Sequence, residues 1–324
     1  MKVEEMFKNA KVLVAGGSGF IGSNLVLRLL EEGSQVRATY WENAPQVKTP
    51  EIEYIQCDLT KFENCRKVVE DMDFVFMCAA NTSGAAVMRN NPLAHVTPNV
   101  LMNTQILAAA YEVQVKKFLF ISSSAAYPPT GNRPVKEDEM FEGDPYDVYF
   151  SVGWMKRYAE ILCKIYAQKI KKHMPVTVVR PSNAYGPYDK FDPGKSHVTA
   201  AIIQKVVSRQ NPIEVWGTGD DLRDLIFIDD LIEGMLLAMK NPDDYNVYNI
   251  ASEKIHSVKD LLKILLELDK YDNASVIFDP SKPTTIPVRV IDCTKAKEEL
   301  GFSVKVGLEE GLRRTVDWYR KNII

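Results

Sequence analysis

The stretch KVLVAGGSGFIG, residues 11–22, decides the fold of this 324-residue chain. Its first five residues form a short, mainly apolar run that is typical of a buried strand. The turn GGSGFIG follows, and an amphipathic helix begins directly after it. In this setting Gly16 allows a tight turn, Gly19 lets the backbone approach a pyrophosphate, and Gly22 permits close helix–strand packing. The stretch therefore predicts a dinucleotide site, with the phosphates at the start of the helix.

Outward from this stretch, apolar runs alternate with amphipathic ones, as in parallel strands joined by helical crossovers. We predict an α/β fold with a Rossmann-type doubly wound parallel sheet in residues 1–180. Pro- and Gly-rich loops then separate short elements, which predicts a smaller substrate-binding lobe in residues 181–324. We leave open whether segments at about 226–250 return to the first domain. The predicted strands are 11–15, 35–40, 53–57, 73–79, 117–123 and 175–180, and the predicted helices are 20–32, 62–71, 92–113 and 151–171.

The composition excludes several classes of partner. A net charge of −3, with 46% hydrophobic and 26% charged residues, is typical of an ordinary globular protein, so we expect no nucleic acid. The five cysteines are odd in number and widely spaced, which favours neither a metal site nor a disulfide framework and suits a reducing cytoplasm. No stretch approaches the roughly 20 apolar residues of a membrane span, and no signal peptide is visible, so we expect no membrane insertion or export.

The choice of dinucleotide stays open. NAD normally requires an acidic residue at the end of the second strand, and NADP a basic residue nearby. Here that position is Tyr40, followed by Trp41 and Glu42, with Arg37 earlier in the strand. Asp58, at the end of the third strand, could accept a hydrogen bond from the adenine amine or cap the helix near residue 62.

A series of short segments carries a family resemblance. The segments are GGSGFIG at 16–22, CDL at 57–59, AA at 79–80, SSSAAY at 122–127, RPSNAYGP at 180–187, SHV at 196–198, VWGTG at 215–219, Arg223, and FIDD at 227–230. Taken in this order they resemble the extended short-chain dehydrogenase/reductase superfamily, that is, the NAD-dependent epimerase/dehydratase family. Within it, the similarity is greatest to GDP-fucose synthase-like nucleotide-sugar enzymes.

The resemblance implies a set of site residues and a homodimer. In such a dimer the helices at about 92–113 and 151–171 would form a four-helix bundle with their mates. Asn183 and Arg223 would contact the diphosphate of a nucleotide sugar, and His197 would be an acid or base at the sugar ring. The implied cofactor contacts are Gly16, Gly19, Phe20, Ile21, Gly22, Tyr40, Asp58, Leu59, Ala79, Ala80 and Lys156; the implied substrate contacts are Ser124, Asn183, His197 and Arg223; and the implied catalytic residues are Ser123, Lys156, Tyr149 and His197.

These residue types suit the chemistry, although each has a simpler explanation. An arginine gives paired, charge-assisted hydrogen bonds to phosphate, and a histidine titrates near neutral pH. Arg223 could instead form a surface ion pair, His197 could be a loop residue without chemistry, and Ser123 could bond to backbone groups at a strand end.

One departure from the family pattern concerns the catalytic base. The superfamily uses a tyrosine four residues before a lysine, whose charge favours the phenolate. Lys156 matches the lysine, but the residue four positions earlier is Val152, which cannot transfer a proton. General acid–base catalysis typically contributes about 10²–10⁴-fold in rate. Another group must then act, and the candidates are Tyr149, His197 and a water held by Ser123.

The resemblance implies an NAD(P)-dependent oxidoreductase that moves hydride at C4 of a nucleotide-activated sugar, with a GDP-hexose or GDP-heptose favoured. GDP-fucose synthases carry a cysteine where this chain has Ala125, and the related dehydratases carry an acidic pair after the serine, which is absent here. Both absences favour simple oxidation or reduction. The alternatives are an epimerase or dehydratase with a transient C4 ketone, and an inactive nucleotide-sugar or dinucleotide sensor. The nucleobase, the sugar and the direction of reaction stay open.

Overall fold

A seven-stranded parallel sheet forms the centre of the computed structural model, which describes residues 3–82, 91–192 and 196–324. Every neighbouring pair in this sheet is parallel, and the order β10-β6-β5-β4-β1-β2-β3 reverses direction between β4 and β1. The predicted doubly wound fold is therefore confirmed. The strands are β1 (Lys11–Ala15), β2 (Gln35–Tyr40), β3 (Ile52–Gln56), β4 (Phe74–Met77), β5 (Lys117–Ile121), β6 (Val176–Pro181) and β10 (Tyr245–Ile250).

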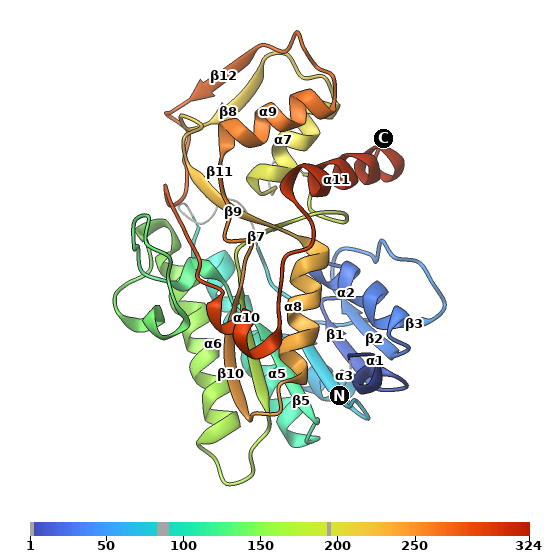
Figure 1. Cartoon of the computed structure of the whole chain (residues 1–324). Helices are drawn as coiled ribbons and strands as arrows, with labels where there is room; N and C mark the ends of the chain where they lie inside the picture. The colour runs from blue at the N-terminus through green and yellow to red at the C-terminus, as the bar shows by residue number, and fades with distance from the viewer. Residues whose placement is uncertain (1–2, 83–90, 193–195) are drawn as a thin grey trace.

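Helices cover both faces of this sheet (Figure 1). On one face α5 packs between α3 and α6, and on the other α8 packs against α1 and α2. Each face has its own apolar core, as expected for a sheet buried on both sides. The helices are α1 (Val3–Phe7), α2 (Phe20–Glu31), α3 (Phe62–Val69), α5 (Leu93–Glu112), α6 (Phe150–Gln168) and α8 (Ile228–Lys240).

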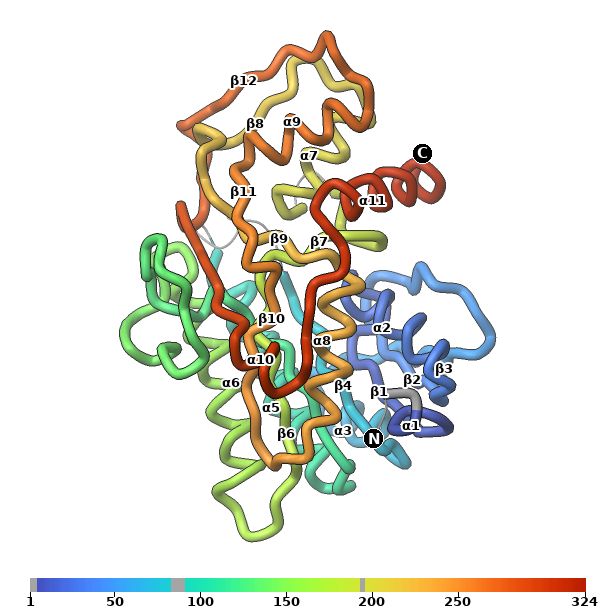
Figure 2. Tube along the Cα trace, viewed as in Figure 1, coloured from blue at the N-terminus to red at the C-terminus, as the bar shows by residue number. Residues whose placement is uncertain are grey.

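The second half of the chain builds a smaller lobe and also returns to the large sheet. The path is visible in Figure 2, where β10 and α8 lie within the lower layer and α7, α9 and α11 lie in the upper part. β10 adds to the sheet beside β6, and α10 (Thr294–Leu300) packs against α8 and β10. The lobe contains β7 (Asn183–Tyr185), β8 (Ile213–Trp216), β9 (Leu222–Phe227), β11 (Ile255–Ser257), β12 (Val276–Asp279), α7 (Val198–Val207), α9 (Val258–Leu268) and α11 (Leu308–Asn322).

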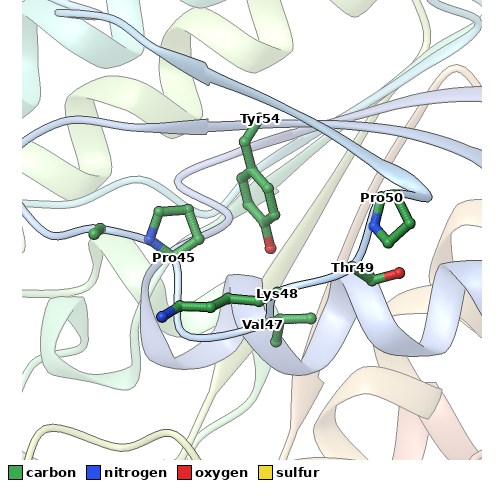
Figure 3. A pocket seen from close by; sticks show the side chains of 7 residues that line it. Pro45, Val47, Lys48, Thr49, Pro50 and Tyr54 are labelled. Atoms are coloured by element: carbon green, nitrogen blue, oxygen red, sulfur yellow. The ribbon is translucent and has the colours of Figure 1, made fainter.

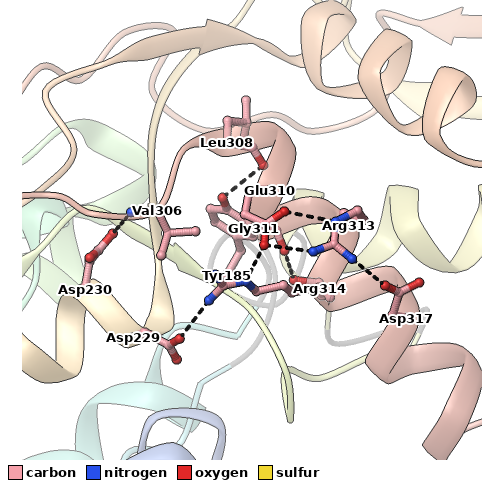
Figure 4. A network of polar contacts seen from close by, with 11 residues as sticks. Tyr185, Asp229, Asp230, Val306, Leu308, Glu310, Gly311, Arg313, Arg314 and Asp317 are labelled. Atoms are coloured by element: carbon pink, nitrogen blue, oxygen red, sulfur yellow. Dashed lines mark hydrogen bonds and ion pairs between the residues drawn. The ribbon is translucent and has the colours of Figure 1, made fainter.

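Polar contacts attach the C-terminal segment to the rest of the chain (Figure 4). The buried carboxylate of Asp230 on α8 accepts hydrogen bonds from the backbone N–H groups of Lys305 and Val306, at 2.9 and 3.0 Å. The Tyr185 hydroxyl donates to the carbonyl oxygen of Leu308 at 3.3 Å. The start of α11 is thereby held against β7 and α8, which links the lobe to the sheet.

A buried ion pair lies at the carboxyl edge of the sheet. The Arg180 guanidinium, at the end of β6, donates to both carboxylate oxygens of Glu160 on α6, with Nε–O distances of 3.0 and 3.2 Å. Both side chains are almost completely buried. Ser122 donates to the same carboxylate from the end of β5, and Tyr127 accepts from Arg180 Nη1 at 2.7 Å. The pair therefore joins two strands, one helix and the segment after β5.

We expect Arg180→Met to lower the free energy of unfolding by about 3–5 kcal/mol, because it leaves Glu160 buried without its cation. Urea unfolding followed by circular dichroism measures the loss. Arg313→Met is the matched control, since Arg313 pairs only with exposed carboxylates on α11 and should cost no more than about 1 kcal/mol. Equal losses in the two variants would contradict the central role of the buried pair.

Candidate active site

The glycine-rich turn is held by the end of β2. Gly16 donates its N–H to Thr39 Oγ1 at 2.9 Å, and Gly17 donates to the carbonyl oxygen of Thr39 at 2.8 Å. Thr39 is buried, so its hydroxyl replaces water as the partner of the turn. Sequence reasoning missed Thr39, because only the strand pairing brings it beside a turn more than 20 residues earlier.

Three of the four glycines in the turn are required by packing within the protein. A Cβ on Gly16 would lie 2.6 Å from the backbone of Ala79, one on Gly17 2.5 Å from the Cβ of Ala38, and one on Gly22 2.1 Å from the carbonyl oxygen of Gly16. A Cβ on Gly19 would meet only that carbonyl, at 3.4 Å. The protein itself therefore has room for a side chain at Gly19.

The start of α2 suits a phosphate group. Gly19 is its N-cap and offers no side chain to the free N–H groups of the first turn, which begins with Phe20, Ile21 and Gly22. A helix N-terminus of this kind stabilises an anion. The open space at Gly19 and the uncapped helix together fit the pyrophosphate of a dinucleotide, and Ala79 and Ala80 follow β4 beside Gly16.

The residues expected near adenosine lie at the ends of β2 and β3. Asp58 accepts hydrogen bonds from the Thr60 hydroxyl at 2.7 Å and from the Thr60 N–H at 3.0 Å, and these bonds lower the pKa of Asp58. The N-cap of α3 is Lys61, so the suggestion that Asp58 caps this helix is wrong. The Leu59 side chain belongs to the apolar core, which leaves only its backbone for a ligand.

The guanidinium of Arg37 binds other protein groups and does not extend toward the end of β2. Its guanidinium pairs with Glu53 at 2.7 Å and donates to the carbonyl oxygens of Val68 and Glu70. These three contacts hold Arg37 in the middle of β2, away from Tyr40 at the end of the strand. Arg37 therefore cannot serve as the cation that an NADP 2′-phosphate requires.

A surface hollow lies beside this end of the sheet, where a loop rather than a helix connects β2 to β3 (Figure 3). Pro45, Val47 and Lys48 from the loop face Tyr54 of β3 across it. The Tyr54 hydroxyl is buried without a hydrogen bond, and burial raises its pKa to about 12. Tyr40 packs edge-on against Tyr54, with ring centroids 6.5 Å apart, so the hollow adjoins the predicted adenosine site.

Ser123 and Lys156 both lie near the end of β5. Ser123 begins the short 3-10 helix η1 (Ser124–Ala126), and its hydroxyl accepts the Ala125 N–H at 3.1 Å. The hydroxyl oxygen thus accepts a backbone hydrogen bond, and the hydroxyl hydrogen can be donated to another partner. Lys156 Nζ donates to the carbonyl oxygen of Ile121 at 2.8 Å, and burial lowers the pKa of Lys156 to about 8, partly offset by Glu160.

Val152 lies one helical turn before Lys156, on the same face of α6. Tyr149 is the last residue of the 3-10 helix η3 (Asp147–Tyr149) and the N-cap of α6. It is half-buried. The position of Tyr149 at the helix start agrees with the sequence prediction, and its role in proton transfer stays a prediction.

Asn183 and Arg223 lie on the adjacent strands β7 and β9. Asn183 is exposed and donates to the carbonyl oxygen of Asp224 at 3.2 Å. Arg223 is buried, and its Nη groups bind Asp221 and the backbone carbonyl oxygens of Leu222, Ile286 and Pro287. Arg223 thus links β9 to the segment at 286–287. A diphosphate that bound Arg223 would have to share its guanidinium with these internal hydrogen bonds.

His197 lies at the start of α7. Desolvation and the charge of Lys190 lower its pKa, which favours the neutral form that can accept a proton. Lys190 reaches the end of β4, where its Nζ binds the Thr82 hydroxyl at 2.9 Å. Asp189 is buried, accepts the Lys190 N–H at 2.7 Å, and has its pKa raised by burial to about 7. No role was predicted for Asp189 or Lys190 from the sequence.

Comparison with known proteins identifies relatives along almost the whole chain. Residues 12–251 match the family model described as the NAD dependent epimerase/dehydratase family. GDP-mannose 3,5-epimerase of Arabidopsis thaliana is 30% identical over 323 residues, covering 98% of this chain and 84% of the relative. GDP-L-fucose synthase 1 of the same plant is 29% identical over 324 residues, covering 98% and 95%.

Solved structures give the same result. The UDP-glucose 4-epimerase of Thermotoga maritima with UDP-glucose superposes with a TM-score of 0.86 at 30% identity, covering 97% of this chain and 100% of that one. The UDP-glucuronic acid 4-epimerase of Bacillus cereus, in complex with UDP-glucuronic acid and NAD, gives 0.83 at 26% identity, covering 96% and 99%. The family resemblance predicted from the sequence is confirmed.

We expect Gly19→Val to weaken NAD binding at least about 100-fold, or about 2.7 kcal/mol, because its side chain fills the space left for the pyrophosphate. The melting temperature should change little, since the protein has room for a Cβ there. Titration calorimetry and thermal unfolding measure the two effects. Gly22→Ala is the contrasting variant, which should lose stability as well as binding. Unchanged NAD affinity in Gly19→Val would contradict the assignment of this turn.

Proposed function

The chain belongs to the NAD dependent epimerase/dehydratase family, and from this premise we propose that it is an oxidoreductase of a nucleotide-activated sugar. The observation that carries the proposal is the open, uncapped cradle at Gly19, which suits a dinucleotide and which internal packing does not require. NAD is the favoured cofactor, because Arg37 is bound elsewhere. A GDP-hexose or GDP-heptose is the favoured substrate, since the plant relatives are named for GDP-mannose and GDP-L-fucose.

In the proposed reaction the bound NAD supplies a hydride acceptor for C4 of the sugar. Ser123 would bind the reacting C4 oxygen with the hydroxyl hydrogen that it does not use within the protein. Lys156 would hold the nicotinamide ribose, since its Nζ lies at the end of β5 and its ammonium has two hydrogens beyond the one bonded to Ile121. Asn183, Arg223 and Ser124 would bind the nucleotide sugar, with Asn183 the most accessible of the three.

The proton from the C4 hydroxyl needs an acceptor, because Val152, four residues before Lys156, cannot transfer a proton. Tyr149, His197 and a water held by Ser123 are the candidates. An epimerase or dehydratase with a transient ketone is the second candidate function, and the lowered pKa of His197 favours it, because a neutral imidazole can remove a proton beside a ketone. A sensor without activity is a third possibility, motivated by Val152 alone.

We also propose a homodimer, in which α5 and α6 pack against their mates. Trp154, Tyr158, Ile161 and Ile165 recur at helical spacing along α6 and are all more than one-third exposed. Leu101 on α5, the helix that packs against α6, is also exposed. Such a contiguous apolar stripe is typical of a subunit interface.

We further propose a cytoplasmic location, since all five cysteines are free thiols. In the described residues no helix is long and apolar enough to cross a membrane.

The function is tested by incubating the purified protein with NAD and GDP-mannose, and separately with UDP-glucose. As an oxidoreductase it should accumulate reduced nicotinamide in step with the oxidised sugar. Lys156→Met should reduce the rate by about 100-fold or more, whereas the exposed Lys263→Met on α9 should retain it. A new sugar isomer in the NMR spectrum without net reduction would establish the epimerase alternative. Binding of both ligands without any turnover would support the sensor and contradict the oxidoreductase.

For the dimer, light scattering at micromolar concentration should give twice the chain mass of 36.6 kDa. Ile161→Arg should weaken association by about 2 kcal/mol or more, because it buries an unpaired charge in the interface. Ile277→Arg, at an equally exposed position on β12, should leave the dimer unchanged. A monomeric wild-type protein, or a dimer that survives Ile161→Arg, would contradict the proposed interface.

A further inference from the structure

Lys190 extends from the small lobe to the large sheet, beyond the carboxyl ends of the central strands. It follows β7, and its Nζ donates to the hydroxyl and the carbonyl oxygen of Thr82, at 2.9 and 3.3 Å. Thr82 belongs to the segment that follows β4, which is exposed at residues 80–82. In an open α/β sheet the ligand lies beyond the carboxyl ends of the strands, so the ammonium of Lys190 borders the space expected for the ligand.

The backbone that carries Lys190 is fixed by contacts on two sides. Asn24 on α2, the helix whose start is expected to bind the pyrophosphate, donates to the carbonyl oxygen of Pro187 at 2.9 Å. The carboxylate of Asp189 is buried and accepts the Lys190 N–H at 2.7 Å. The protein therefore holds the start of this side chain in place, so that its ammonium is presented at the end of β4.

The groups around the ammonium make this place electropositive. Both contacts with Thr82 are to uncharged oxygen atoms. Desolvation and the charge of Lys190 lower the pKa of His95 on α5 and of His197 at the start of α7, which favours neutral imidazoles there. Asp189 also interacts with this charge, and burial raises the pKa of Asp189 to about 7, which weakens its negative charge near neutral pH. An anionic group of the ligand is therefore attracted to this place.

The neighbouring strand indicates which part of a sugar would reach Lys190. Ser123, at the end of β5, is the proposed partner of the reacting C4 oxygen, and β5 pairs with β4. Neighbouring strands lie only about 4.8 Å apart. The exocyclic C6 of a hexose is attached to C5, next to C4, so a substituent on C6 can extend from the end of β5 to the end of β4. A C6 carboxylate would form a charge-assisted hydrogen bond with the ammonium, whereas a neutral C6 hydroxyl lacks the opposite charge.

We propose that Lys190 is a specificity-determining residue that binds the C6 carboxylate of a nucleotide-activated hexuronic acid. This inference rests on the proposed function, and it makes the favoured hexose an acidic one. Thr82 holds the ammonium from the side of β4, and the carboxylate binds it from the side of the sugar ring. Lys190 thereby differs from Asn183 and Arg223, which are expected at the diphosphate.

The test compares the binding of two matched pairs of nucleotide sugars: GDP-mannose with GDP-mannuronic acid, and UDP-glucose with UDP-glucuronic acid. Within each pair only the C6 group differs, so the ratio of the two affinities reports on that group alone. Titration calorimetry uses the complex with NADH, which cannot accept a hydride. The wild type should bind the uronic acid of the better-bound pair at least about tenfold more tightly than the neutral sugar.

Lys190→Met should remove this preference and leave the affinity for the neutral sugar within about threefold, because only the charged partner is lost. Lys190→Arg keeps the charge and should retain most of the preference. Lys205→Met is the matched control, since Lys205 is also a half-buried lysine and donates to the carbonyl oxygen of Glu214 at 2.6 Å within the lobe. This control should bind both sugars as the wild type does.

Thr82→Val separates recognition of the ligand from a link between the two halves of the chain. It removes the hydroxyl that accepts from Nζ but leaves the ammonium, so the preference for the uronic acid should persist. If Lys190→Met and Thr82→Val instead weaken both members of a pair equally, Lys190 only joins the lobe to the sheet, and the inference is overturned. Thermal unfolding identifies variants that fail to fold, and Lys190→Gln, which keeps a donor without the charge, then replaces Lys190→Met.

The remaining outcomes separate this inference from the proposed function. Equal binding of both members of each pair by the wild type would overturn the inference and leave the proposed function intact. Binding of none of the four nucleotide sugars would reject both. A preference for the uronic acid that depends on Lys190, without hydride transfer from that sugar to NAD, would support the role of Lys190 and reject the oxidoreductase, so the two failures are distinguishable.

Discussion

The candidate site depends on the ion pair between Arg180 and Glu160. In a low-dielectric interior such a pair is stable only when additional hydrogen bonds satisfy the remaining polar atoms. Ser122 and Tyr127 supply them here, and Asn249 on β10 completes the set by accepting from the Tyr127 hydroxyl at 2.6 Å. Because these groups come from β5, β6, α6 and β10, the pair determines how the strand ends and the helix that carries Lys156 are placed relative to one another.

Charge-assisted hydrogen bonds, in addition to apolar packing, position the segment that follows β5. Three arginines from separate parts of the chain bind residues 126–128: Arg157 from α6, Arg180 from β6 and Arg289 from the segment before α10. Each donates to a carbonyl or hydroxyl oxygen whose direction is set by the turn, so a shift of the turn would break several charge-assisted bonds at once. The serine at the start of this turn is therefore held from both halves of the chain.

The sequence predicted most of the sheet but few of the polar contacts. Each strand and helix predicted in the first 180 residues lies within three residues of its predicted bounds, because apolar periodicity and glycine-rich turns are local signals, whereas the short helix α1 was not predicted. Thr39, Glu160 and Arg289 carry no such signal, since each acquires its role only when distant segments meet. Arg223 shows the opposite case: a motif suggested a ligand contact, whereas the folded chain binds most of its guanidinium internally.

Val152 lies four residues before Lys156 on α6 and carries no group that could transfer a proton. Lys156 lies beside the end of β5 whether or not a phenol precedes it, because its Nζ is bound to Ile121 and its charge interacts with Glu160. Burial lowers the pKa of Lys156 to about 8, and the charge of Glu160 partly offsets this lowering. The contacts with Ile121 and Glu160 come from β5 and from α6 itself, so the position of Lys156 does not depend on a phenol at residue 152.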